Sequence, residues 1–322
     1  MTENSFRSRL LAKDKKGCHE YLKTHLEGKK LVLAIHDLLF LSIYVNVENL
    51  SVHPVCLVNS IKNFISDDKE NPSIKLLLFI IDYLFQFENR KNDQNILDES
   101  CKKGLVKSAF VGDLENACQN GEWDKAQSLM AELFTASDQS RGTFDALIEL
   151  ALQDCPKNAL FVYHILRAYQ FQEYKRDNWN FTCALFRQLK NNKLPEPHHQ
   201  QKLDLEVLLE NVIRKGDIVL FSAMKRILET TYVRSAGYNR EISYWLSKMT
   251  FLKKKKPKEE VDVSKYKPIS FISKAEEIIE KEQPNDQKVT KLISLEAIRS
   301  LMKNIDKNNY ESLISRFSYL TL

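Results

Sequence analysis

Three histidines of this chain lie in apolar surroundings, where an imidazole is either paired inside a core or part of a binding site. His36 falls within a run of leucines beside Asp37, His53 directly precedes Pro54, and His164 lies within the apolar stretch NALFVYHILRAYQF. A buried imidazole has two ring nitrogens to satisfy, and neutral imidazole is also a common metal ligand. If two or three of these rings meet, the chain could hold a metal ion or a small ligand there. Otherwise each ring is a satisfied core histidine or a helix cap.

The segment SVHPVCLVNSIKNF, residues 51–64, combines a histidine and an amide with an apolar run. Pro54 suits the first turn of a helix, and His53 or Ser51 can accept hydrogen bonds from the free amides at its start. Asn59 falls inside the predicted helix, where an unpaired amide is destabilising. We therefore expect Asn59 to bind a neighbouring helix or a group in a cavity. The candidate ligand or metal residues are His53, His164, His36 and Asn59.

Other familiar chemistries lack their residue patterns. The stretch HEYLKTH places His19 and His25 six residues apart, whereas a zinc protease helix needs a spacing of four to bring both rings to one face. The sequence has no convincing set of Glu-x-x-His motifs on two helices, no nucleophile elbow and no glycine-rich phosphate loop, so no catalytic residue and no cofactor is assigned. His198 and His199 follow two prolines in PEPHHQQK and are expected to be exposed.

These residues are carried by amphipathic helices, because apolar residues recur at helical spacing through most of the chain. Examples are GEWDKAQSLMAELF, TFDALIELAL and KLISLEAIRSLMKNI, and Gly216 is well placed to end a helix over KLDLEVLLENVIRK. Alternating strand patterns are nearly absent. The sequence predicts an all-α fold, a helical bundle or array with a core domain over 1–252, a basic linker or loop over 253–269 and a C-terminal helical segment over 270–322.

Two parts of the predicted core have similar sequence patterns. A helix over 31–45 leads to HPVCLVNSIKNF, and another over 144–153 leads through DCPK to NALFVYHILRAYQF. In both, a proline heads the second helix and a polar residue then interrupts an apolar run. This similarity predicts two loosely related helical halves.

Composition indicates a globular, cytoplasmic protein. Hydrophobic residues make up 43% and charged residues 28% of 322 residues, which is ordinary for a folded domain. The six cysteines form no CxxC motif and are expected to be free, buried thiols. The most apolar run, LVLAIHDLLFLSIYV, is too short to span a membrane and carries a histidine and an aspartate.

The net charge of +5 is small, and much of the excess is concentrated in one patch. A solvated linker explains that patch more simply than contact with nucleic acid or an acidic membrane, so nucleic acid is not an expected partner. The C-terminal helices could instead pack on the core or bind another protein. The basic patch consists of Lys253, Lys254, Lys255, Lys256 and Lys258.

Two segments resemble a family of uncharacterised bacterial helical proteins. One is HPVCLVNS, residues 53–60, and the other, residues 157–164, is similar to a GHKAIFVAN segment of that family. The resemblance implies an all-helical fold with a shared site at two helix starts, and similar regions accompany Rieske-type domains, which implies redox biology. Lys157 stands where the family tends to have a histidine, and the cysteine and histidine pairs of a Rieske centre are missing here.

Two functions are compatible with the sequence. The first is a non-catalytic helical scaffold or ligand-binding protein, because amphipathic helices are abundant and no catalytic constellation is complete. The second is a histidine-dependent metal or redox enzyme that uses His53 and His164 at the heads of two core helices, with His36 and Asn59 in support.

Overall fold

The computed structural model describes residues 5–24, 26–103, 109–172, 174–190, 192–249 and 268–303, together with Ser312, Leu313 and Arg316. Over these residues the chain forms sixteen α-helices, two short 3-10 helices and no strand. An isolated antiparallel bridge joins Val45 and Asn89. The predicted all-α fold is confirmed.

The helices follow one another along the chain with mostly short connections. Their bounds are α1 Phe6–Leu11, α2 Lys15–Lys23, α3 Gly28–Ile43, η1 Leu50–Val52, α4 Pro54–Ile65, α5 Ile74–Leu84, α6 Asp93–Lys103, α7 Val111–Gln119, α8 Trp123–Ala136, α9 Gly142–Leu152, α10 Cys155–Phe171, η2 Lys175–Asp177, α11 Asn178–Leu189, α12 Leu205–Lys215, α13 Ile218–Leu228, α14 Ser235–Lys248, α15 Pro268–Glu280 and α16 Asn285–Met302.

The two helices that carry His53 and His164 begin as their sequences predict. Pro54 opens α4, and the His53 ring nitrogen Nδ1 accepts a hydrogen bond from the Val55 amide at 3.2 Å. In α10 the cap is Asp154, and Pro156 occupies the first turn. Each proline stands where its missing N–H removes no helical hydrogen bond, so both starts follow from local chemistry.

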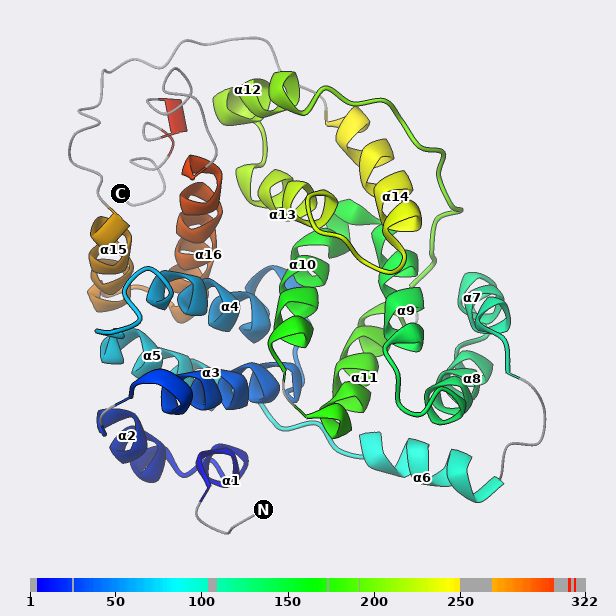
Figure 1. The fold of residues 1–322 in the computed structure, drawn as a ribbon, viewed down its shortest axis with the longest axis horizontal. Coiled ribbons are helices and arrows are strands. Elements are labelled where there is room, and N and C mark those ends of the chain that lie inside the picture. The colour runs from blue at the N-terminus through cyan, green and yellow to red at the C-terminus, as the bar shows by residue number, and fades with distance from the viewer. Residues whose placement is uncertain are drawn as a thin grey trace.

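Helix α10 lies near the centre of the molecule and positions the others (Figure 1). It packs against α4 and α3 on one side, α13 and α14 on another, and α9 and α11 on a third. Most of its side chains are buried, among them Phe161, Val162, Ile165 and Leu166. Burial on several sides is expected for a central helix.

The C-terminal helices pack on this core. Helix α16 lies against α4 and α13, and α15 lies beside α5 and α16 (Figure 1). The predicted apolar stripe of α16 is buried at Leu292, Leu295, Ile298 and Leu301. The basic patch Lys253–Lys256 with Lys258 lies outside the described residues.

Within the described part of the chain, no helix combines the length and the apolar character needed to cross a membrane. All six cysteines are free, and five of them are buried as predicted; Cys101 is exposed. Burial raises the pKa of Cys18 to about 12, so this thiol stays protonated and unreactive at neutral pH.

Candidate functional site

Three of the four candidate residues meet where α4 packs against α10. Asn59 Nδ2 donates a hydrogen bond to His164 Nδ1 at 2.9 Å, and the His53 ring lies 4.7 Å from the ring of Phe161, one turn before His164. All three polar side chains are buried, with Asn59 and His164 fully excluded from solvent. The buried amide predicted to bind a neighbouring helix therefore does so.

Both histidines are held neutral by their surroundings. Burial, reinforced by the positive charge of Arg90, lowers the pKa of His53 to about 3. Burial also lowers the pKa of His164 well below its usual range, with further contributions from Arg226 and Lys62. Because each Nδ1 accepts a hydrogen bond, each neutral ring carries its proton on Nε2.

His36 belongs to a different polar cluster. Its ring nitrogen Nδ1 lies 3.3 Å from Asp37 and 3.4 Å from Arg7, and Arg7 in turn pairs with Asp177 at 2.8 Å. This cluster ties α1 and α3 to the start of α11. Among the described residues, no three histidine, cysteine or carboxylate side chains are grouped closely enough to hold a metal ion. Metal or redox chemistry at these histidines stays a prediction.

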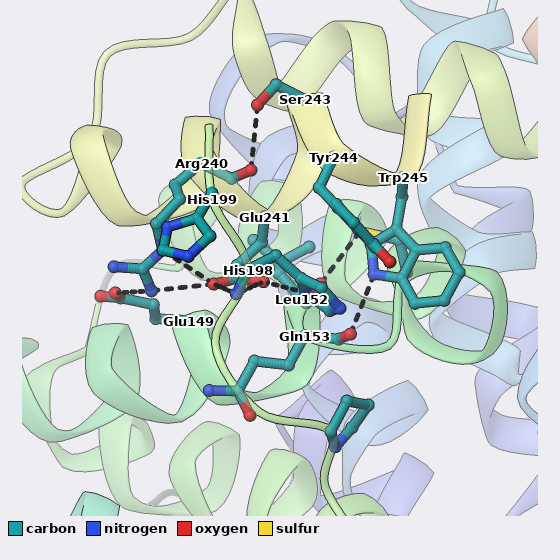
Figure 2. Close-up of polar contacts among 12 residues, drawn as sticks. Glu149, Leu152, Gln153, His198, His199, Arg240, Glu241, Ser243, Tyr244 and Trp245 are labelled. Carbon is teal, nitrogen blue, oxygen red and sulfur yellow. Dashed lines mark hydrogen bonds and ion pairs between the residues drawn. The ribbon is translucent and has the colours of Figure 1, made fainter. Parts of the chain in front are cut away.

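His198 is less exposed than its proline-rich sequence predicts, whereas His199 is exposed as expected. The extended segment 192–204 lies along α14, where His198 Nδ1 is 2.7 Å from Glu241 and its ring stacks on Tyr244 at 3.8 Å (Figure 2). Glu241 is completely buried. Arg240 Nε donates to the same carboxylate at 2.9 Å, and the His198 amide donates to it at 3.2 Å. These contacts satisfy the buried carboxylate and bind His198 to α14.

A cavity of about 800 Å³ opens beside the His53 end of this interface. It lies where α3 ends and where α4, α10 and α16 begin, and the last turn of α11 closes one side. Its volume is in the range of sites that enclose small organic ligands. The charged side chains and the histidine that line it are His53, Glu48, Arg90, Lys157, Arg187, Lys190 and Asp286.

Arg90 is the most unusual of these side chains, because its guanidinium is only 3% exposed and incompletely paired. Nη2 donates to the Asn180 carbonyl at 2.8 Å and lies 3.0 Å from Asp93. Nε and Nη1 have no hydrogen-bond partner among the described residues. Burial lowers the pKa of Arg90, opposed by the negative charge of Asp93. Both nitrogens are closed off from solvent, and unpaired buried donors of this kind are destabilising.

Asp93 cannot neutralise the charge around it, because two guanidinium groups share it. Arg187 Nη2 donates to Asp93 Oδ1 at 2.9 Å while Arg90 approaches Oδ2. Lys157 in the first turn of α10 and Lys190 just after α11 line the same cavity. Positive charge therefore exceeds negative charge on this side of the cavity, an arrangement that attracts anions.

The sequence did not reveal Arg90, Arg187 or Lys190 as candidates. They come from separate parts of the chain, and nothing in the local pattern ENRKND around Arg90 marks a buried guanidinium. Lys157 was noted only because it stands where the resembling family tends to have a histidine. The sequence feature that could have located the cavity is the pair of helix starts at Pro54 and Pro156. His53 and Lys157, which lie at these two starts, both line the cavity.

Comparison with known proteins found no family model, no curated protein and no solved structure that matches this chain.

Proposed function

We propose that this protein is a non-catalytic ligand-binding protein that holds a small anionic molecule in the cavity beside His53. The observation that carries the proposal is the wall of a ligand-sized cavity, where the buried Arg90 lies together with the exposed Lys157 and Arg187. An oxyanion can accept charge-assisted hydrogen bonds from cationic side chains of this kind, and such bonds are about twice as strong as neutral ones.

The neighbouring side chains support the same chemistry. Arg187, Lys157 and Lys190 supply further positive charge, and the neutral His53 offers an Nε2–H donor without adding charge. Several cationic side-chain donors around one concave site favour the binding of an anion. The absence of a base or nucleophile of raised reactivity among the lining residues favours binding over catalysis.

Inorganic phosphate is the simplest probe of this proposal. Titration calorimetry at low ionic strength is expected to detect phosphate binding, and the melting temperature is expected to rise with phosphate concentration, because a ligand of the folded state stabilises it. Lys157→Met and Arg187→Gln remove cations from exposed side chains. Each is expected to raise the Kd of phosphate about tenfold, the effect of one lost charge-assisted hydrogen bond.

Two variants serve as matched controls because they remove the same charges elsewhere. Lys125→Met and Arg176→Gln lie on exposed side chains that do not line the cavity. They are expected to leave phosphate affinity unchanged. If the native chain bound no phosphate, or if all four variants weakened binding equally, the proposed site would be wrong.

A further inference from the structure

The cavity is much larger than an oxyanion, and the walls away from the cations are apolar or acidic. Val47, Leu50 and Phe87 provide apolar surface, while Glu48 and Asp286 bring carboxylates to the same space. A bare phosphate would leave these walls without a partner. The ligand must therefore carry a second part that suits both apolar contact and carboxylate acceptors.

The positive and negative side chains come from different elements. The cations belong to α10, α11 and the segment that follows α5, whereas Asp286 belongs to the first turn of α16. The Tyr83 hydroxyl donates to the Val52 carbonyl at 2.8 Å and lies 3.3 Å from Asp286 Oδ1. Asp286 therefore lies beside the Tyr83 hydroxyl at the cavity wall.

Carboxylates at that wall select against a second anionic group and in favour of hydrogen-bond donors. Hydroxyl groups donate readily to carboxylates, and the carbon atoms that bear them can rest on the apolar side chains. Amide side chains at Asn49 and Gln188 add further donors and acceptors around the same space. A molecule with one anionic end and several hydroxyl groups matches this distribution.

We infer that the ligand is a sugar phosphate, with its phosphate at Arg90, Lys157 and Arg187 and its hydroxyl groups at Asp286 and Glu48. This inference rests on the proposed function, because it assigns a chemical class to the ligand of the same cavity. It adds the prediction that the sugar contributes to affinity and that the carboxylates distinguish the two ends of the molecule.

Four probes separate the contributions of the two ends: ribose 5-phosphate, ethyl phosphate, inorganic phosphate and ribose. Calorimetric titration of the full chain is expected to give ribose 5-phosphate a Kd at least tenfold lower than ethyl phosphate or inorganic phosphate. Ribose alone is expected not to bind measurably. Equal affinity for the three phosphates would overturn the inference while leaving anion binding intact, whereas no binding of any phosphate would overturn the proposed function itself.

Asp286→Asn is expected to change the affinities for ribose 5-phosphate and for inorganic phosphate differently. The side chain is exposed and asparagine has nearly the same shape as aspartate, so folding is expected to be preserved. Ribose 5-phosphate should bind several-fold more weakly because a charged acceptor is lost. Inorganic phosphate should bind equally well or slightly better because a repelling charge is removed.

Glu282→Gln is the matched control, since Glu282 is an exposed carboxylate just before α16 that does not line the cavity. It is expected to change neither affinity. If Asp286→Asn weakened both ligands in equal proportion, or neither, Asp286 would not contact the sugar and this assignment would be wrong.

Discussion

At the scale of single residues, this protein is distinguished by polar groups that its core buries without fully pairing. His164 Nε2 and Asn59 Oδ1 have no hydrogen-bond partner among the described residues, and the same is true of two nitrogens of Arg90. Buried polar atoms are normally satisfied, so each such atom lowers the stability of the folded state. Arg90 differs from the other two because it lines a cavity.

The depressed pKa of His53 makes stability depend on pH. In the unfolded chain this ring titrates near its usual pKa of 6.5, whereas in the folded protein its pKa is about 3. The unfolded state therefore binds more protons between these values, and the stabilisation is fully present above pH 6.5 and is lost as the pH falls toward 3. For His53 alone, the free energy of unfolding should fall by about 2 kcal/mol between pH 7 and pH 5.

His53→Asn isolates this contribution, because asparagine can still cap α4 but does not titrate. Urea unfolding at pH 7 and pH 5 should show a smaller pH effect in this variant than in the native chain. His199→Asn removes an exposed histidine and should leave the pH effect unchanged. An unaltered pH effect in His53→Asn would mean that the His53 ring is protonated to the same extent in both states.

At the scale of helices, polar contacts fasten α16 to its neighbours. Glu296 is 1% exposed and accepts two hydrogen bonds from Arg226 Nη1 of α13, both at 2.9 Å, and one from Asn63 Nδ2 of α4 at 2.8 Å. Arg299 of the same helix pairs with Asp67, which follows α4. The docking of α16 thus depends on charges that are removed from solvent and mutually compensated.

Arg226→Met leaves the Glu296 carboxylate buried without its main cation. Breaking a buried pair from one side is strongly destabilising, so the free energy of unfolding should fall by about 3 kcal/mol. The double variant Arg226→Met/Glu296→Met replaces both charges by apolar groups of similar length and should recover at least half of the loss. Chemical denaturation followed by circular dichroism measures both quantities.

The rescue is the informative part of this experiment. A double variant as unstable as Arg226→Met would show that the loss comes from the packing of Arg226 on Tyr163, whose ring lies 3.9 Å from the guanidinium carbon, and not from the unpaired carboxylate.

At the scale of the whole molecule, the helices share one hydrophobic core. A contiguous cluster of buried apolar side chains runs from Phe6 in α1 to Leu301 in α16 and includes members of α4, α10 and α13. When one helix of a shared core unfolds, the helices packed against it lose their contacts with it. The unfolding of these helices is therefore coupled. The cavity lies among these same elements, since α10, α11 and α16 all contribute to its wall.

This coupling predicts a single unfolding transition for the described helices. The three tryptophans, Trp123, Trp179 and Trp245, report on α8, α11 and α14, while circular dichroism reports on all helices including α16. The two signals should give the same urea midpoint. A loss of helical signal that precedes the fluorescence change would instead indicate that α15 and α16 unfold separately from the core.

Local sequence was sufficient to predict the helical class, the starts of α4 and α10 and the buried stripe of α16. These features depend on residues within a few turns of one another: Pro54 with its cap His53, Gly216 after α12, and apolar residues at helical spacing. Backbone geometry and side-chain periodicity are local properties, so a single sequence contains them. The sequence also indicated that Asn59 needed a partner, because an amide in an apolar helix must be paired.

Only the tertiary structure decided which polar residues meet. In the folded protein Asn59 binds His164, His36 lies in a separate cluster with Arg7, and His198 lies against Glu241. The tertiary structure also buries Arg90 and sets Arg187 and Lys157 beside the same cavity. Such contacts depend on how helices far apart in the chain pack together. Side-chain spacing along one helix contains no information about which residue of another helix it will face, so the cavity and its charge appear only in the folded protein.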